Sequence, residues 1–334
     1  MSLYRNLMWF LKGIKEYTRD GYQLASRGFV VEDLVVSAVG RSFMITGANS
    51  GIGKETAMAI AKKGGTIHMV CRNKDKAEVA RAEIIRESGN PEVHVHILDM
   101  SESSQVWEFA ENFKRQYPSL NVLINNAGCI VNKREMNSNG LEKNFATNTL
   151  GVYILTQSLI PLLLKSRGPR VITVSSGGML VQRLRPHNLQ SLGGHFFKGA
   201  RVYTQNKRQQ VVLTEHWAKT NLVIHFSVMH PGWADTPDSQ SKPPLEPQED
   251  LQTWGHQLHH SVRFGDSSRT QKQSGPAPLD DSQDLQTVGN QPPHSVRLRD
   301  LFSDSDATLS RYSGAPGRPL AATTPFLGHR YFRT

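Results

Sequence analysis

A tyrosine and a lysine stand four residues apart in the segment Tyr203-Thr-Gln-Asn-Lys207. If this segment is helical, both side chains lie on one face, because four residues make slightly more than one turn. A free phenol has a pKa of about 10, and a neighbouring ammonium favours the phenolate and lowers that pKa toward neutral pH. Proton transfer is most effective when the pKa of the group is close to the working pH. The pair therefore predicts acid–base catalysis by Tyr203, with Lys207 lowering its pKa.

A hydroxyl group is expected beside this pair. Ser175 and Ser176 end a short β-branched run that begins at Arg170, which is typical of a buried strand. Side chains at the carboxyl ends of parallel strands share one crevice, so a serine here can face the same ligand as Tyr203. Alternation along the strand directs the two serines to opposite sides and does not choose between them.

A phosphate-binding turn is predicted nearer the N-terminus. The segment Thr46-Gly-Ala-Asn-Ser-Gly-Ile-Gly53 follows another β-branched run and leads into a helix-like pattern. Its glycines allow a tight turn, a close approach of the backbone to a pyrophosphate, and close packing of helix on sheet. Unpaired amides and the positive end of the helix dipole then attract the phosphates. The expected cofactor contacts are Thr46, Gly47, Ser50, Gly51, Ile52 and Gly53.

The end of the next strand-like run bears on the choice of cofactor. NAD-selective sites place a carboxylate near this point to bind the ribose 2′-hydroxyl, whereas a basic residue accommodates the 2′-phosphate of NADP. Cys71 offers no carboxylate, and Arg72 offers a fork-shaped cation suited to phosphate. We therefore predict NADP(H) rather than NAD. The alternative is that Arg72 is only a solvated charge at the end of a strand.

Two further strand ends carry polar groups or glycine. Asp99 ends one run, and Asn125-Asn-Ala-Gly128 ends the next. Since such positions line the crevice where ligands bind in parallel sheets, we expect Asp99, Asn125, Ala127 and Gly128 near the cofactor. For Asn125 the alternative is a structural amide that ties loops together.

A regular alternation of strands and helices is needed to position these residues. Six short apolar runs, bounded by Gly, Pro, Asn or Ser, predict strands at 42–46, 66–71, 93–98, 121–125, 170–175 and 223–229. Longer stretches between them predict helices at 51–63, 74–87, 103–116, 141–164 and 202–219. Near-continuous apolar strands separated by helices are typical of a sheet covered on both faces. With right-handed crossovers, this pattern predicts an α/β fold with an open, doubly wound parallel sheet of the Rossmann type.

The charge and cysteine content limit which binding partners and which cellular compartment the sequence predicts. The 334 residues include 39 Lys and Arg against 29 Asp and Glu, a net charge of +10. This balance favours anionic partners such as phosphate cofactors or acidic membrane surfaces. With no zinc-finger spacing and no aromatic-basic RNA signature, no nucleic-acid partner and no metal site are expected. Cys71 and Cys129 form no Cys-x-x-Cys pair, which favours a reducing, cytoplasmic environment.

The N-terminal segment, residues 1–37, has amphipathic character. Its apolar residues repeat at helical spacing, with basic residues off that stripe: Leu3, Leu7, Phe10, Ile14 and Tyr17. Two interpretations remain open, a peripheral membrane contact through residues 1–20 or packing on the chain's own domain or a partner. The apolar core is too short for a signal peptide, and no run approaches the ~20 residues that span a bilayer. The expected location is therefore the cytoplasmic side, with membrane association undecided.

The composition changes after Pro237. Most of the prolines lie beyond it, mixed with Ser, Gln, Asp and His, and residues 250–263 recur in altered form at 284–297. Such sequence buries too little apolar surface to offset the entropy of ordering. We therefore expect a catalytic domain over 38–237 followed by a disordered, low-complexity tail over 238–334.

Together, these motifs resemble those of the short-chain dehydrogenase/reductase family in order and spacing. The matching features are Thr-Gly-Ala-Asn-Ser-Gly-Ile-Gly, Asn-Asn-Ala-Gly, Asn148, Ser176, Tyr203 with Lys207, and His230-Pro-Gly-Trp-Ala-Asp-Thr236. Within the family the chain is similar to the retinol-dehydrogenase-like group, from residue 1 to about residue 237. The resemblance implies an oxidoreductase that transfers a hydride between NADP(H) and a lipophilic carbonyl or alcohol.

The resemblance also implies roles for the four catalytic positions. Tyr203 would be the general acid in carbonyl reduction and the base in alcohol oxidation. Ser176, rather than its neighbour, would bind the substrate oxygen and stabilise its developing charge. Lys207 would hold the nicotinamide ribose, and Asn148 would position a water that links Lys207 to solvent.

Further cofactor contacts follow from the same resemblance. Asp99 would contact the adenine, and Tyr203 and Lys207 would lie beside the nicotinamide ribose. Pro231 and Thr236 belong to the motif after the last strand, and Thr236 would contact the nicotinamide carboxamide.

The chain departs from the family pattern after its Pro-Gly motif. Relatives continue with a substrate-covering segment, a helix and a final strand, and here the low-complexity tail replaces them. The expected fold therefore lacks the usual last strand and helix and leaves a sheet edge unpaired. The alternative function that follows is a catalytically impaired, spliced or truncated isoform that at most binds nucleotide. Met179, Leu180 and Val181 suggest an apolar substrate unless they are ordinary loop packing, and the oligomeric state is left open.

Overall fold

The computed structural model describes residues 3–29, 35–192, 197–234 and 332–333. Six parallel strands form its sheet: β1 (Ser42–Thr46), β2 (Thr66–Cys71), β3 (Val93–Ile97), β4 (Val122–Asn125), β5 (Arg170–Val174) and β6 (His225–Met229). Their spatial order is β3-β2-β1-β4-β5-β6. The order reverses direction between β1 and β4, which is where ligands bind in doubly wound sheets. The predicted fold class is confirmed.

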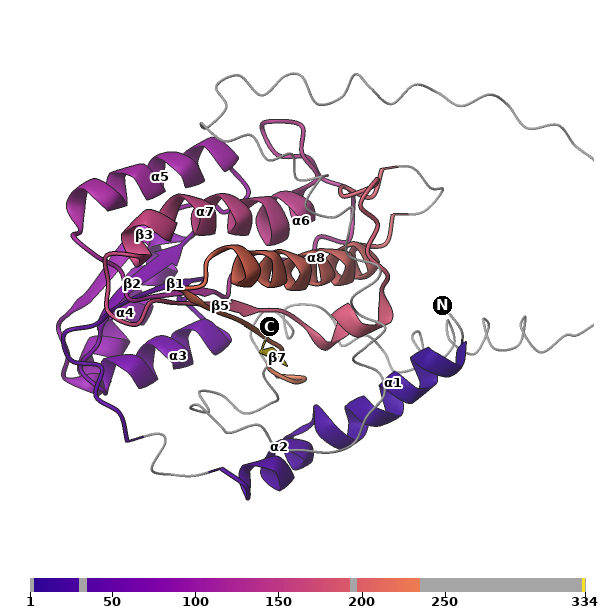
Figure 1. Ribbon diagram of the computed structural model, residues 1–334, viewed down its shortest axis with the longest axis horizontal. Coiled ribbons are helices and arrows are strands. Elements are labelled where there is room, and N and C mark those ends of the chain that lie inside the picture. The colour runs from indigo at the N-terminus through magenta and orange to yellow at the C-terminus, as the bar shows by residue number, and fades with distance from the viewer. Residues whose placement is uncertain (1–2, 30–34, 193–196, 235–331, 334) are drawn as a thin grey trace, which may run out of the picture. The chain divides into compact units, whose positions relative to one another are not determined.

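Helices cover both faces of this sheet (Figure 1). On one face lie α3 (Gly51–Ala61) and α4 (Lys74–Ser88), which contact each other and β1 to β3. On the other lie α5 (Ser103–Gln116), α7 (Gly151–Leu163) and α8 (Gly199–Thr220). Strands enclosed in this way carry mostly buried side chains, and every residue of β4 is buried, whereas the edge strand β3 is only partly buried. The core therefore comes from strand runs that the sequence shows directly.

The stretch 141–164, predicted as one helix, is built from three pieces. A short helix α6 (Lys143–Phe145) leads into a π-helical turn at Ala146–Leu150, which continues as α7. The Glu142 carboxylate caps the first piece by accepting hydrogen bonds from the amides of Asn144 and Phe145. A π-helical turn inserts one residue into the helical period and is frequent at functional sites. Here it carries Asn148.

The N-terminal segment forms two helices instead of the single one predicted. Helix α1 (Leu3–Glu16) ends two residues before Thr18, whose hydroxyl accepts a hydrogen bond from the Gly21 amide at 3.4 Å and caps α2 (Arg19–Ser26). A threonine in this extended conformation is a favourable N-cap, so a new helix starts there. Within the described residues, neither helix nor any other is long and apolar enough to cross a membrane.

The far edge of the sheet carries a short pairing. Beyond β6, the two residues of β7 (Phe332–Arg333) pair antiparallel with Ser227 and Val228. The edge that was expected to be unpaired therefore holds two residues from the end of the chain, in the opposite direction to the other strands. The predicted tail over 238–334 otherwise lies outside the described residues, as does Thr236.

Candidate active site

Tyr203 and Lys207 lie on α8, as the helical spacing predicted. The Lys207 ammonium lies 5.5 Å from the centre of the Tyr203 ring. It donates a hydrogen bond to the carbonyl oxygen of Val174, the last residue of β5, at 2.7 Å. Lys207 is buried and Tyr203 is partly buried. The carboxyl end of β5 therefore fixes the lysine beside the phenol.

The pKa of Tyr203 shifts in the direction opposite to the one predicted. Burial raises it above the usual value for a phenol, a hydrogen bond with the Ser176 side chain acts in the lowering direction, and the Cys129 thiol acts in the raising direction. Burial also lowers the pKa of Lys207 to about 8. Desolvation by burial is the largest cause for both groups, so the pKa of Tyr203 lies above its usual value, and the lowering by Lys207 stays a prediction.

The two consecutive serines have separate partners. The buried Ser175 hydroxyl donates to the backbone oxygen of Lys207 at 2.9 Å, joining β5 to α8. Ser176 is half-buried, caps the short 3₁₀ turn at Gly177–Val181 through the Gly178 amide at 3.3 Å, and contacts the Tyr203 phenol. Only Ser176 thus faces the same space as Tyr203. This geometry supports the choice that strand alternation left open.

Asn148 connects three segments beneath the site. Its side-chain amide exchanges two hydrogen bonds with the backbone of Cys129, each 2.9 Å, and its own carbonyl oxygen accepts from the Gln210 side chain at 2.6 Å. A Cβ added to Gly128 would lie 3.3 Å from the Asn148 side-chain oxygen and 3.5 Å from the Lys207 ammonium. The Asn148 side-chain oxygen and the Lys207 ammonium therefore both lie close to the Cα of the same glycine, on the side where a Cβ would project. Asn148 ties the loop after β4 to the π-helical turn.

The glycine-rich turn after β1 is tied to the turn after β4. The Thr46 hydroxyl accepts from the amides of Asn126 and Ala127 at 3.0 and 2.9 Å. The Asn126 side chain in turn donates to the carbonyl oxygens of Thr46 and Gly47 at 2.9 and 3.2 Å. Gly47 has φ +68°, a left-handed conformation that glycine adopts without strain. A Cβ on Gly53 would lie 2.2 Å from the Gly47 oxygen, so glycine is required there for the helix to approach the turn.

The N-terminus of α3 is open at this turn. Ser50 occupies the N-cap position, and its side chain makes no capping hydrogen bond. The residues that follow, Gly51 and Ile52, are partly exposed. The first amides of a helix lack intrahelical partners and attract anions. The predicted phosphate contacts Ser50 to Gly53 therefore surround a set of amides suited to a pyrophosphate.

Arg72 lies just past the end of β2 and is exposed. The structure gives its guanidinium no hydrogen bond or ion pair within the part of the chain that it describes. Burial raises the pKa of the nearby Cys129 thiol, and the Arg72 charge acts as a smaller contribution in the lowering direction. Cys71 before it is buried, and its thiol contacts the backbone at Ala48 and Asn49 in the glycine-rich turn. Arg72 is thus a cation available to a ligand in that turn.

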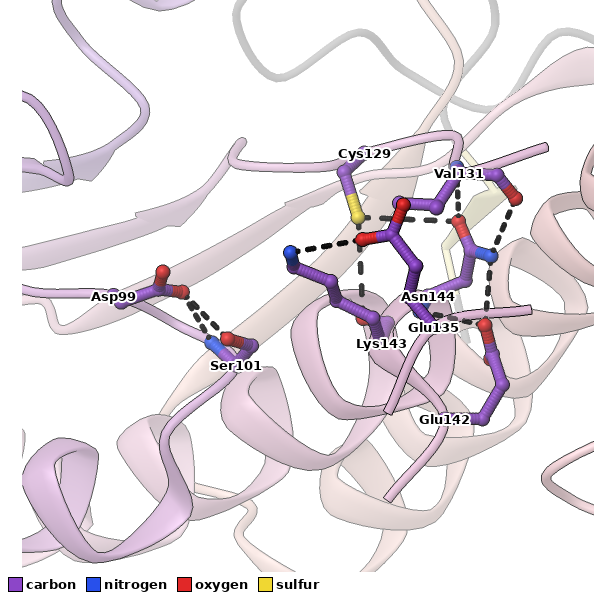
Figure 2. Close-up of polar contacts among 8 residues, drawn as sticks. All are labelled: Asp99, Ser101, Cys129, Val131, Glu135, Glu142, Lys143 and Asn144. Atoms are coloured by element: carbon purple, nitrogen blue, oxygen red, sulfur yellow. Dashed lines mark hydrogen bonds and ion pairs between the residues drawn. The ribbon is translucent and has the colours of Figure 1, made fainter. Parts of the chain in front are cut away.

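Asp99 and Asn125 have different surroundings. One Asp99 carboxylate oxygen accepts from the amide and hydroxyl of Ser101 at 2.9 and 2.8 Å, as Figure 2 shows, and the side chain stays partly exposed. Asn125 is fully buried and donates to the Thr156 hydroxyl at 2.9 Å. Its side chain points into the interior, so the structural alternative fits Asn125, and Asn126 is the residue that reaches the glycine-rich turn.

The loop after β4 is anchored on α6 (Figure 2). The Asn144 side chain accepts from the Val131 amide at 2.7 Å and donates to the Val131 carbonyl at 3.0 Å. Cys129 contacts the Lys143 carbonyl and Asn144 at 3.9 Å each, and burial raises the pKa of its thiol. Ala127 and Gly128, the remaining predicted contacts of this loop, are therefore held in place from both sides. Ala127 is partly exposed and Gly128 is exposed.

The loop after β6 contributes Pro231, which is partly exposed beside the buried His230. The His230 ring accepts from the Gly232 amide at 3.1 Å and packs edge-on against Tyr17 at 4.4 Å between ring centres. In the described residues, no group of three or more His, Cys, Asp or Glu side chains is arranged to hold a metal ion.

Five residues that contribute to this region are not predicted from the sequence. Asn126 is the neighbour of the predicted Asn125, although alternation after β4 could have suggested that only one of the two faces the turn. Cys129 and Asn144 carry no pattern that singles them out, because their role depends on how the loop after β4 folds onto α6. Tyr17 belongs to the helical stripe of the N-terminal segment and Trp9 does not, and the sequence gives no sign of which loops they contact.

These features define a class of protein. A parallel sheet with a glycine-rich turn after its first strand, an open helix N-terminus, and a phenol, an ammonium and a hydroxyl at one end is the architecture of a dinucleotide-dependent oxidoreductase. Residues 41–185 match the short chain dehydrogenase family model.

Known proteins extend this match. The chain is 63% identical over 237 residues to "Dehydrogenase/reductase SDR family member 12" of Bos taurus, covering 71% of this chain and 74% of the bovine one. It is 58% identical over 273 residues to the protein of the same name from Homo sapiens, covering 82% and 81%. "Retinol dehydrogenase 11" of Mus musculus is 36% identical over 200 residues, 59% of this chain and 62% of that one. The chain belongs to the short-chain dehydrogenase/reductase family and is an oxidoreductase.

Solved structures agree with this assignment. A crystal structure of the short chain dehydrogenase from Shigella flexneri has a TM-score of 0.50 and 25% identity, and covers 65% of this chain and 81% of that one. A protein from Mycobacterium paratuberculosis has a TM-score of 0.53 and 30% identity, covering 62% and 73%.

Proposed function

We propose that this chain is an NADP(H)-dependent oxidoreductase that reduces a lipophilic carbonyl, with Asn148, Ser176, Tyr203 and Lys207 as its catalytic set. The observation that carries this proposal is the contact of the Tyr203 phenol with Ser176, with the Lys207 ammonium beside its ring. Family membership supplies the reaction class, and this geometry supplies the groups that would perform it.

The chemistry needs a proton donor and a group that binds the carbonyl oxygen. NADPH, when bound, supplies the hydride to the carbonyl carbon. Ser176 hydrogen-bonds the substrate oxygen, and Tyr203 donates its proton to that oxygen as negative charge develops on it. The raised pKa of Tyr203 keeps the phenol protonated at neutral pH, which is the form that reduction requires. Lys207 would orient the nicotinamide ribose.

The preference for NADP(H) rests on Arg72. A guanidinium just after β2 can form charge-assisted hydrogen bonds with a 2′-phosphate, and the strand ends in Cys71 instead of a carboxylate that would bind a ribose hydroxyl. Replacing Arg72 with Ala should lower kcat/KM for NADPH by about 10- to 100-fold, since such bonds contribute ~1.5–3 kcal/mol. The activity with NADH should change little.

A matched control is Lys76→Ala. It removes an exposed cation of the same charge from α4, the helix that follows Arg72, and leaves the guanidinium at the end of β2 in place. Equal losses in the two variants, or an equal loss with NADH, would show that the general positive field is responsible and would overturn the assigned role.

The lipophilic substrate is supported by relatives named as retinol dehydrogenases. Within this chain, Met179 is buried with its sulfur 3.4 Å from the Ser175 hydroxyl oxygen, so it belongs to the packing of the loop. Leu180 is exposed at the same turn and is the better candidate for a substrate contact. The proposed class is a carbonyl compound with a hydrocarbon body.

A peripheral membrane contact through α1 is a second part of the proposal. Leu7, Phe10, Leu11 and Ile14 recur at i, i+3, i+4 and i+7, and each remains about half exposed in the folded chain. Lys12 and Lys15 are exposed beside them and suit anionic headgroups. Such a helix lies in the interface, so the substrate could enter from the lipid.

Flotation with vesicles tests this contact. We expect the full chain to bind vesicles containing anionic lipid and a Leu7→Ser/Leu11→Ser variant to bind much less. Leu222→Ser, at a highly exposed leucine before β6, is the control. Undiminished flotation of the double variant would remove α1 from the proposal.

The principal experiment measures reduction of a panel of retinoid, steroid and simple aldehydes and ketones with NADPH and NADH. Tyr203→Phe should lower turnover by about 10²- to 10⁴-fold while leaving NADPH binding intact. Tyr153→Phe, on α7 against Trp217, serves as the control for loss of a phenol. A Tyr203→Phe variant with normal turnover would refute the mechanism. A wild-type chain that is stabilised by NADPH but reduces nothing would instead indicate the nucleotide-binding, catalytically impaired alternative.

A further inference from the structure

The N-terminal helix α1 is bonded to the residue that follows Ser176. The Trp9 indole N–H donates a hydrogen bond to the Gly177 carbonyl oxygen, with 2.9 Å between Nε1 and O. Gly177 is the first residue of the 3₁₀ turn that Ser176 caps. A Cβ on Gly177 would lie 3.4 Å from the Tyr17 ring and 3.7 Å from His230 Nδ1. The peptide next to the substrate-binding hydroxyl is therefore packed between α1 and the loop after β6.

The N-terminal segment also contacts the loop after β6 directly. The Trp233 amide donates to the Tyr17 carbonyl oxygen at 2.7 Å, and the Tyr17 ring packs edge-on against His230. Trp9, Phe10 and Tyr17 surround the Trp233 ring with centroid separations of 6.2, 6.2 and 6.0 Å. Pro231, a predicted cofactor contact, lies between His230 and Trp233. Residues 9–17 thus contact both the loop after β5 and the loop after β6.

A glycine in the middle of α1 permits this contact. A Cβ on Gly13 would lie 2.7 and 2.8 Å from two atoms of the Trp233 ring. Glycine within a helix costs about 1 kcal/mol relative to alanine, so it is placed there against the helical preference. The close approach of Trp233 accounts for that choice.

From these contacts we infer that α1 is part of the active site, with Trp9 as a positioning residue that sets the orientation of Ser176. The contacts span a large distance in sequence, and they join a segment outside the dinucleotide-binding sheet to the loops after β5 and β6. This role rests on the proposed function for its catalytic consequence. The physical connection between α1 and the Ser176 turn can be tested without it.

The first test is Trp9→Phe, which keeps an aromatic ring and removes the N–H donor. We expect kcat for carbonyl reduction to fall about fivefold, the effect of losing one net hydrogen bond, with the Kd for NADPH unchanged. In a Ser176→Ala background the same substitution should cause little further loss, because Trp9 acts through Ser176. Trp107→Phe, at a half-exposed indole on α5, is the matched control. Equal losses from Trp9→Phe in both backgrounds would overturn the positioning role.

The second test is amide hydrogen exchange in the peptide that covers residues 176–181. Trp9→Phe should accelerate exchange there about fivefold and leave β1 and α3 unchanged, whereas Trp107→Phe should alter neither. Gly13→Ala should have the same local effect even though alanine favours the helix, because the added carbon displaces Trp233. Unchanged exchange in both variants would refute the inference. Inactivity of the wild-type chain would refute the proposed function and leave this exchange result as an independent answer.

Discussion

The Ser175 hydroxyl donates a hydrogen bond to the backbone oxygen of Lys207, with 2.9 Å between the two oxygen atoms. The next residue, Ser176, contacts the Tyr203 phenol one helical turn away on α8. The two adjacent serines at the end of β5 therefore have different contacts. Ser175 joins the strand to α8, and Ser176 faces the Tyr203 phenol.

This division predicts opposite effects for two alanine substitutions. Ser176→Ala should lower kcat by about 10²- to 10³-fold, because it removes a donor to the developing oxyanion, while changing the melting temperature little. Ser175→Ala removes a buried hydrogen bond between β5 and α8 and should cost about 0.5–1.5 kcal/mol of stability with a smaller loss of kcat. Thermal denaturation and steady-state kinetics on both variants check this. The reverse pattern would mean that Ser175 is the catalytic hydroxyl.

The pKa of Tyr203 predicts how rate depends on pH. Because burial raises this pKa above its usual value, the phenol stays protonated through neutral pH. Reduction needs the protonated form, so its rate should be flat from about pH 6 to 8. Oxidation of the corresponding alcohol needs the phenolate, whose fraction grows tenfold with each pH unit below the pKa, so its rate should rise with pH.

Initial rates in both directions across this range measure the effect. Lys207, whose pKa is lowered to about 8, loses its charge near the upper end and should limit the rise in oxidation there. If the reduction rate instead falls with a midpoint near pH 7, Lys207 does lower the pKa of Tyr203 in the working enzyme. That result would support the prediction from the sequence that Lys207 lowers the pKa of Tyr203 toward neutral pH.

The glycine-rich turn yields a prediction about cofactor binding. Gly53→Ala places a Cβ 2.2 Å from the Gly47 oxygen and 2.5 Å from the Asn126 side chain, so the turn must shift. We expect a loss of about 1–3 kcal/mol of stability from overpacking and a weaker thermal shift on adding NADPH. Gly28→Ala is the control, since its Cβ would meet only the Ala25 oxygen at 3.6 Å. Equal NADPH-induced shifts in wild type and Gly53→Ala would separate this glycine from the cofactor site.

Much of the sheet could be predicted because buried parallel strands leave a direct mark on sequence. The predicted bounds of β1, β2 and α5 agree with the structure residue for residue. β1 ends directly before Gly47, β2 ends two residues before Asn73, and α5 ends two residues before Pro118, so a turn-forming residue close to each boundary indicates where the element stops.

The remaining features depend on contacts that sequence spacing does not contain. The π-helical turn interrupts the predicted helix where Asn148 bonds the Cys129 backbone, a partner 19 residues earlier. Asn125 and Asn126 have the same side chain, and only the direction of β4 decides which one reaches the glycine-rich turn. The pKa of Tyr203 follows its burial, which is a tertiary property. Motifs therefore predict the candidate reacting groups, and packing sets their pKa values.

A histidine cluster on the outer strands carries the last prediction. His68 of β2 and His96 of β3 lie 3.1 Å apart between Nδ1 and Nε2, under the rings of Phe113 and Tyr117 from α5. Burial, the first cause, and the neighbouring His96 and His94 lower the pKa of His68 to about 3. Burial and His94 lower that of His96 to about 4. Both rings are therefore neutral in the folded chain over a range where unfolded histidines, with a pKa of about 6.5, are charged.

The sign of the pH effect follows from proton uptake. Below about pH 6.5 His68 and His96 bind protons in the unfolded chain but stay neutral in the folded chain. The free energy of unfolding therefore falls as pH decreases toward 4. When both histidines contribute, the unfolded chain binds two more protons than the folded chain. The free energy of unfolding should then change by about 2.7 kcal/mol per pH unit. His68→Gln and His96→Gln should each reduce that slope. His94→Gln, whose side chain is 40% exposed, should reduce it less.

Denaturant unfolding at several pH values between 4 and 7 measures these slopes. The comparison uses slopes instead of absolute stability, because each glutamine also changes the packing against Phe113 and Tyr117. A loss of packing lowers the free energy of unfolding equally at every pH. Removal of a histidine that protonates only in the unfolded chain changes how steeply that free energy depends on pH, so the two effects can be separated. An unaltered slope in both His68→Gln and His96→Gln would show that other groups govern acid unfolding and that these imidazoles accept protons without leaving the folded state.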